Sequence, residues 1–147
     1  MIKSTEHFSF TVSKMEDSLH FFCDLLGLKA TPVMEVDDED LRRIIGMPDA
    51  HLRISLVQVP DNKNIELIEY VKPQGKTIDL KTCNAGVAHI AFVVDDLDKV
   101  YEDLSNKGVD FVSPPIRVPA NDGKGRWAVC YLHGPDGITL EFIEKEI

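Results

Sequence analysis

Two histidines and two glutamates in this sequence have types and spacings that suit a divalent metal ion. His7 and His89 each open a short run of alternating residues, and Glu66 and Glu141 follow them at similar intervals. Imidazole nitrogens and carboxylate oxygens form a mixed ligand set that suits Zn²⁺, Ni²⁺, Co²⁺, Mn²⁺ or Fe²⁺. Four protein ligands leave two positions of an octahedral ion open for neighbouring oxygens of a substrate. The metal would then act as a Lewis acid on a developing enolate or alkoxide.

The two histidines open predicted strands that resemble each other. Residues 7–12 read HFSFTV and residues 89–94 read HIAFVV, and in both runs the histidine falls on the smaller, more polar face. Glu66 and Glu141 fall on the inner face of later strands, where a carboxylate is costly unless it is paired, hydrogen-bonded or bound to metal. A lone histidine at a strand start is more often an ordinary hydrogen-bonded residue, and we keep that interpretation for His20, His51 and His133. The repeat favours a functional role for the other two.

The chain reads as two copies of a βαβββ module, at about 5–72 and 86–145, joined by a linker at 73–85. In the first copy we expect a strand at 7–12, followed by a helix that is capped by Ser13 and Glu16 and ends at Gly27. Extended residues at 28–36 lead to a short helix at 37–46, which has Leu41, Ile44 and Ile45 on its apolar side. A hairpin of strands at 51–59 and 65–71 completes the copy. In the second we expect a strand at 89–94, a helix capped by Asp95 or Asp96 and ending near Gly108, a short strand near Phe111, a loop at 113–126, and strands at 127–132 and 138–143. The pattern predicts one α+β domain, 1–147, in which two modules build a curved, cup-shaped mixed sheet with helices outside.

Composition excludes several classes of function. The formal net charge is −9 and no cluster of Lys and Arg is interleaved with aromatics, which argues against nucleic-acid and membrane-surface binding. Three cysteines form no CxxC pair, which is typical of reduced thiols in a cytosolic protein. No apolar stretch approaches the length of a membrane span or signal peptide. We therefore expect a soluble cytoplasmic protein that acts on a small molecule.

The motifs HFSFTV, IELIEY, GVAHIAFVVDD and GPDGITLEF, in that order across two βαβββ modules, resemble the vicinal-oxygen-chelate superfamily. This family has the glyoxalase/bleomycin resistance/dioxygenase fold and includes glyoxalase I, methylmalonyl-CoA epimerase and the extradiol dioxygenases. The resemblance implies one divalent metal held by His7, Glu66, His89 and Glu141, and a homodimer. The stretches GMPDAHLRISLVQV and IELIEYVKPQG are most similar to the valiolone-epimerase group.

The resemblance implies proton transfer through a metal-chelated enediolate on a small oxygenated substrate, by an isomerase, epimerase or lyase of the lactoylglutathione-lyase type. Glu141 and Glu66 are the candidate base and acid, because the family implies that a ligand carboxylate can detach and move the proton. Two alternatives stay open. One is an Fe²⁺ extradiol-type dioxygenase, which in the family uses two histidines and one glutamate, and the other is a metal-free protein that sequesters a ligand.

Strand parity suggests which other side chains line the site and which do not. The predicted substrate contacts are Ser9, Thr11, Arg53, Tyr70, Arg126 and Tyr131. Glu69, Glu144 and Glu146 fall on the outward parity or in the tail, and we expect them to be solvated. The sequence leaves open the substrate, the metal, and whether one chain or two chains complete the site.

Overall fold

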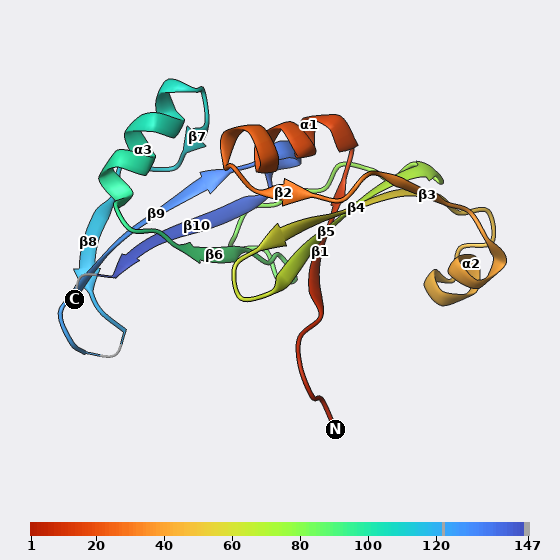
Figure 1. The fold of residues 1–147 in the computed structure, drawn as a ribbon, viewed down its shortest axis with the longest axis horizontal. Coiled ribbons are helices and arrows are strands. Elements are labelled where there is room, and N and C mark those ends of the chain that lie inside the picture. The colour runs from red at the N-terminus through yellow and green to blue at the C-terminus, as the bar shows by residue number, and fades with distance from the viewer. Residues whose placement is uncertain (122, 146–147) are drawn as a thin grey trace. The chain divides into compact units, whose positions relative to one another are not determined.

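The computed structural model describes residues 1–121 and 123–145 and divides the chain into two compact units, Met1–Thr77 and Ile78–Ile147 (Figure 1). Each unit contains one five-stranded mixed sheet, and the strand orders are β1-β5-β4-β2 and β6-β10-β9-β7. In each sheet one further short strand pairs with the second-last strand of its unit: β3 pairs with β4, and β8 pairs with β9. The predicted α+β class and the two repeated modules are therefore confirmed.

In the first unit, strands form where polar and apolar residues alternate in the sequence. Its elements are β1 (His7–Val12), α1 (Met15–Leu19), the π-helical η1 (His20–Leu25), β2 (Lys29–Ala30), β3 (Met34–Val36), α2 (Glu39–Ile45), β4 (His51–Val59) and β5 (Lys63–Lys72). β1 runs parallel to β5, and β4 and β5 form the predicted hairpin. The hairpin turns through Asp61 and Asn62, which both have positive φ, a conformation that Asn and Asp adopt more readily than most residues.

The second unit repeats this order, with fewer elements between its first strand and its final hairpin. Its elements are β6 (Ile90–Val93), α3 (Leu97–Asn106), β7 (Asp110–Phe111), β8 (Ile116–Pro119), β9 (Arg126–His133), the 3₁₀ turn η2 (Pro135–Gly137) and β10 (Thr139–Lys145). β6 runs parallel to β10, which is antiparallel to β9. The predicted cap of α3 is correct for Asp96, whose carboxylate accepts a hydrogen bond of 3.0 Å from the Lys99 amide.

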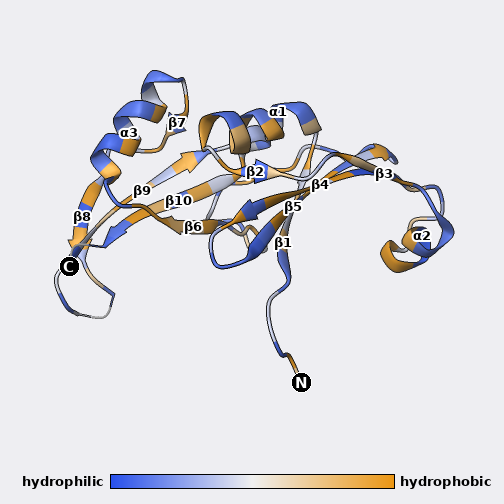
Figure 2. Ribbon diagram, viewed as in Figure 1, coloured by the Kyte–Doolittle hydropathy of each residue, from blue (hydrophilic) through white to orange (hydrophobic). Residues whose placement is uncertain are grey.

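In each unit, one face of the sheet packs against a helix. Ile65 and Leu67 of β5 are fully buried on the side of α1, and Leu140 and Phe142 of β10 are buried on the side of α3. The period of two along each strand then directs the residues between them, Glu66 and Glu141, to the opposite face. Figure 2 colours the strands by hydropathy and shows polar and apolar residues along both sheets.

Glu69 and Glu144 are not solvated as their parity suggested. The Glu69 carboxylate accepts a hydrogen bond of 2.9 Å from the Met15 amide, and that of Glu144 accepts one of 2.7 Å from the Leu97 amide. These amides open α1 and α3, where backbone donors lack partners within the helix and the dipole favours an anion. The outward parity in these strands therefore faces a helix start and not solvent. Glu146, expected to be solvated as well, lies outside the described residues.

In the first unit, Arg53 donates a further hydrogen bond to the carboxylate of Glu69. Its guanidinium donates to Glu69 at 2.9 Å and to Glu16 at 2.6 Å, and its hydrogen bond lowers the pKa of the Glu16 carboxyl. The N-cap position of α1 is Lys14, one residue after the predicted Ser13, and the Glu16 carboxylate pairs with Arg53.

Three smaller expectations also differ from the structure. The stretch predicted as a loop at 113–126 contains β8, which the prolines and glycines around it conceal. The short helix predicted at 37–46 forms, but Ile44 is 82% exposed instead of packing on an apolar side. His89 directly precedes β6 and does not open it.

Among residues 1–121 and 123–145, no helix has the length and apolar composition needed to span a membrane.

Replacing either helix-capping glutamate should destabilise the fold. Glu69→Ala and Glu144→Ala each remove a charged acceptor from a helix start, and we expect the free energy of unfolding to fall by about 1–2 kcal/mol. Glu69→Ala should cost more, because it also deprives Arg53 of one partner. Urea denaturation followed by circular dichroism measures both changes, with Glu102→Ala on the exposed side of α3 as the control. Loss no greater than that of the control would contradict the capping role.

Candidate functional site

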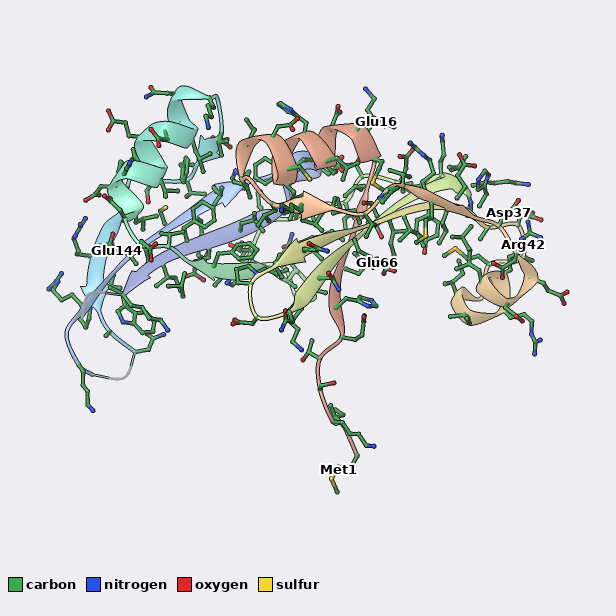
Figure 3. All side chains as sticks on the ribbon, viewed as in Figure 1. Met1, Glu16, Asp37, Arg42, Glu66 and Glu144 are labelled. Atoms are coloured by element: carbon green, nitrogen blue, oxygen red, sulfur yellow. The ribbon has the colours of Figure 1, made fainter. Side chains whose placement is uncertain are left out.

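In the first unit, parallel pairing brings His7 next to Glu66. Ser9 of β1 is the register partner of Glu66 in β5, so His7 lies two residues before the position beside the carboxylate and on the same face. The distance from His7 Nε2 to Glu66 Oε2 is 3.4 Å. The Glu66 side chain is 20% exposed, and Figure 3 labels it on β5. A half-buried carboxylate is thus paired with an accessible imidazole.

The second unit has the same pair in the same register. Ala91 of β6 is the register partner of Glu141 in β10, and His89 again lies two residues earlier. The distance from His89 Nε2 to Glu141 Oε2 is 3.1 Å, and the glutamate side chain is 17% exposed. Two sheets of unlike sequence thus place one histidine and one glutamate at equivalent positions with the same nitrogen directed at the carboxylate.

A different neighbour contacts each imidazole. The Glu6 carboxylate forms a hydrogen bond with His7 Nδ1, and the tautomer with a proton on Nδ1 leaves Nε2 as an electron-pair donor. The Tyr131 ring lies beside that of His89, with 5.2 Å between centroids. Burial and the negative charge of Glu141 raise the pKa of the Tyr131 phenol, which therefore stays protonated near neutral pH and able to donate a hydrogen bond.

Both pairs have the spacing of two ligands on one metal ion. Ligand atoms about 2.1 Å from a metal lie about 3.0 Å apart at the octahedral angle and about 3.4 Å apart at the tetrahedral angle. The observed distances are 3.1 Å and 3.4 Å. Among residues 1–121 and 123–145, no three His, Cys, Asp or Glu side chains form a group that could hold a metal. Each unit therefore supplies two donors of suitable chemistry.

The structure places the predicted substrate contacts on two different faces. Ser9, Thr11 and Tyr70 share the face of Glu66, since Ser9 pairs with Glu66, Thr11 pairs with Ile68, and Tyr70 follows at the same parity. Tyr131 is the cross-strand partner of Glu141 and shares its face.

The two arginines lie differently from their expected positions. Arg53 is the cross-strand partner of Glu69, so it faces α1 and not the side of Glu66. Arg126 is exposed, lies on the parity opposite to Tyr131, and donates to the Arg117 carbonyl at 2.6 Å. Arg53 thus pairs with two glutamates of the first unit, and the register of β9 puts Arg126 on the parity opposite to Tyr131. Their contact with a substrate stays a prediction.

The other three histidines have carboxylate partners away from these pairs. His20 contacts Asp24 at 2.8 Å, His51 contacts Glu35 at 2.9 Å, and His133 contacts Asp110 at 2.8 Å. Their ordinary hydrogen-bonded role is the one that the sequence predicts.

The sequence reading missed Glu6, which lies directly before His7. Ala88 occupies the corresponding place before His89, so the repeat gave no signal for it. The available signal was that Glu6 is adjacent in sequence to a predicted metal ligand. A carboxylate is a common hydrogen-bond partner for the second ring nitrogen of a histidine that binds metal.

Comparison with known proteins agrees with the fold and the motif order. Along its sequence the chain is 28% identical to the uncharacterized protein YwkD of Bacillus subtilis over 145 residues, which cover 99% of both chains. It is 24% identical to a probable lactoylglutathione lyase of Synechocystis sp. over 138 residues, 94% of this chain and 92% of that protein.

Two solved structures show the same fold. A glyoxalase family protein from Bacillus cereus superimposes with a TM-score of 0.81 at 21% identity, covering 98% of this chain and 95% of the other. The trypanothione-dependent glyoxalase I of Leishmania major superimposes with a TM-score of 0.66 at 17% identity, covering 97% and 87%. A family model matches residues 4–142 of the sequence, and the chain belongs to the Glyoxalase/Bleomycin resistance protein/Dioxygenase superfamily.

Proposed function

We propose that this protein is a divalent-metal-dependent isomerase, epimerase or lyase that moves a proton on a small oxygenated substrate. The single observation that carries the proposal is the repeated register of the two pairs, His7 with Glu66 and His89 with Glu141. In both sheets the same ring nitrogen faces a glutamate at the same register offset. Family membership and the resemblance to a probable lactoylglutathione lyase support the same class of reaction.

In this proposal the four side chains together hold one metal ion, chosen from Zn²⁺, Ni²⁺, Co²⁺, Mn²⁺ and Fe²⁺. The bound metal would supply Lewis-acid polarisation of two neighbouring substrate oxygens. The imidazoles of His7 and His89 are neutral donors that remain in place. Glu6 supports one of them by keeping the Nδ1 proton of His7, which presents the Nε2 electron pair on the side of Glu66.

The two glutamates carry the proton in the proposed reaction. A carbon next to a carbonyl loses its proton to one carboxylate, and the electron pair left on carbon delocalises into the carbonyl oxygen. The second carboxylate returns a proton to the same carbon or to its neighbour, which gives epimerisation or isomerisation. We assign Glu141 and Glu66 to these two roles. In this proposal Tyr131, protonated and next to Glu141, donates a hydrogen bond to a substrate oxygen.

The proposal includes a cytoplasmic location and a homodimer. Its four ligands can come from one chain or from two exchanging chains, since both arrangements use the same pairs. A dioxygenase would need only three of these ligands, so the repeated pairing of Glu66 favours proton-transfer chemistry.

Metal binding should depend on all four residues. The protein should bind one of these divalent ions per site, and His7→Gln, Glu66→Gln, His89→Gln and Glu141→Gln should each weaken binding. We expect each loss to exceed the roughly 10–100-fold cost of removing an outer hydrogen-bond partner. Competition titration against a chromogenic chelator measures the affinity. His51→Gln is the matched control, because His51 also pairs with a glutamate, Glu35. Unchanged affinity in the Glu66 and His89 variants would disprove the metal site.

Removing the partner of His7 should weaken the metal more modestly. Glu6→Ala frees the Nδ1 side of the ring, and we expect about a tenfold loss of affinity, at the low end of the range for such partners, because Glu6 is 76% exposed. Glu35→Ala, which removes the partner of His51, should leave affinity unchanged. Equal affinity in both variants would show that Glu6 does not orient His7.

Proton transfer can be detected without knowing the substrate in advance. Metal-loaded protein in D₂O should introduce deuterium next to the carbonyl or hydroxyl-bearing carbon of one class among 2-oxo acids, cyclitols and acyl-CoA compounds, measured by mass spectrometry. Glu141→Gln and Glu66→Gln should slow exchange by about 10²–10⁴-fold, the usual contribution of general acid and base groups, and His51→Gln should not. A yellow ring-fission product from catechol with Fe²⁺ under oxygen, without exchange, would establish the dioxygenase alternative.

A further inference from the structure

The side of the second sheet that carries Glu141 is mostly apolar, and we call it the Glu141 face. From Glu141 toward the end of β10, cross-strand register orders it into three successive rows of side chains. The rows are Ala91, Glu141 and Tyr131; then Val93, Ile143, Val129 and Ile116; then Lys145, Trp127 and Val118. The face therefore runs from a carboxylate, through an entirely aliphatic row, to a row that contains an ammonium group and an indole.

These apolar residues do not belong to the core of the unit. The core lies on the opposite side of the sheet, where Ala128, Leu132 and Leu140 are fully buried. On the Glu141 face, by contrast, Val93 is 61% exposed and Ile116 is 55% exposed. A sheet face that is open to water normally carries polar residues, so an exposed aliphatic row indicates a binding surface.

The corresponding face of the first unit has different chemistry. Its first row is Ser9, Glu66 and Leu56, and its second row is Thr11, Ile68 and Ile54. Its third row is Tyr70 and Leu52. Hydroxyls stand where the second unit has Ala91 and Val93, and neither Lys145 nor Trp127 has a counterpart of the same type. The apolar strip with a cationic end is therefore a property of the second unit alone.

Charge is placed at the two ends of the strip. Glu141 and His89 lie at one end, and Lys145 at the other holds its Nζ 5.2 Å from the centre of the Trp127 ring. Lys145 lies four residues after Glu141 along β10, which corresponds to about 13 Å. An extended molecule of several carbons spans this distance.

We infer that the Glu141 face binds an organic anion with three parts: vicinal oxygens near Glu141, an aliphatic or aryl middle over the Val93, Ile143 and Val129 row, and a carboxylate or other anionic group near Lys145. The position of the oxygens rests on the proposed function. The apolar and anionic parts rest on the rows of the second sheet alone. The substrate class is thus an oxygenated carboxylic acid with a hydrophobic body, rather than a compact, fully hydroxylated sugar acid.

The single tryptophan of the chain makes this inference directly testable. Trp127 is the only indole, so intrinsic fluorescence of the full chain reports on the third row. The probe is 2-hydroxyoctanedioate, titrated with and without Zn²⁺. Two comparison probes are 2-hydroxyoctanoate, which lacks the far carboxylate, and 2-hydroxybutanedioate, which lacks the aliphatic body. We expect the first probe to change the Trp127 emission and to bind about tenfold more tightly than either comparison probe.

Variants assign the preference to particular residues. Lys145→Gln should bind 2-hydroxyoctanedioate and 2-hydroxyoctanoate equally, because the ammonium no longer distinguishes them. Val93→Ser, which gives the second row a hydroxyl like that of the first unit, should weaken both. Lys99→Gln in α3 is the charge-matched control and should behave as the unchanged protein. Circular dichroism of each variant verifies that it is folded.

The outcomes separate this inference from the proposed function. No Trp127 response to 2-hydroxyoctanedioate in either metal state overturns the inference, even if the four ligands bind metal. Emission that changes with protein concentration but not with probe also overturns it, because a second copy then covers the face. A response that requires Lys145 in metal-free protein supports the inference on its own, whether or not the metal site is later disproved.

Discussion

The parallel pairing of the first and last strands of each unit is the constraint on which the site depends. Backbone hydrogen bonds fix β1 beside β5 and β6 beside β10, and they place each histidine two residues before the neighbour of a glutamate. Because side chains alternate between faces, a shift of one residue would turn Glu66 or Glu141 toward a helix. The chemistry of the site is thus specified by main-chain geometry, and side-chain contacts refine it.

Sequence reasoning succeeded where a period of two or a repeat carried the information. The faces of Glu66 and Glu141 follow from the buried residues on either side of them, and the α3 cap follows from a local motif at Asp96. Parity alone did not predict the pairing of Arg53 with Glu69 in another strand. It also failed for Glu69 and Glu144, since a residue directed away from the site can face a helix end as easily as water. No single-strand pattern contains this cross-strand information.

The two units share the histidine–glutamate pairs but not the surroundings of those pairs. Glu6 contacts His7, whereas Ala88 precedes His89, and Leu56 stands opposite Glu66 where Tyr131 stands opposite Glu141. Ser9 and Leu56 flank the glutamate of the first sheet, whereas Ala91 and Tyr131 flank that of the second. The two glutamates therefore have different neighbours although their strand register is the same.

Both final strands contain a glutamate, two apolar residues and a second glutamate, as Glu66 to Glu69 and Glu141 to Glu144. The first member of each pair faces the histidine, and the second accepts a hydrogen bond from the first amide of a helix. One short stretch of strand therefore joins the chemistry of the site to the anchoring of the fold. A homologous protein without the proposed activity would still need the second glutamate for its fold. That residue therefore marks the architecture, whereas the first glutamate belongs to the proposed site.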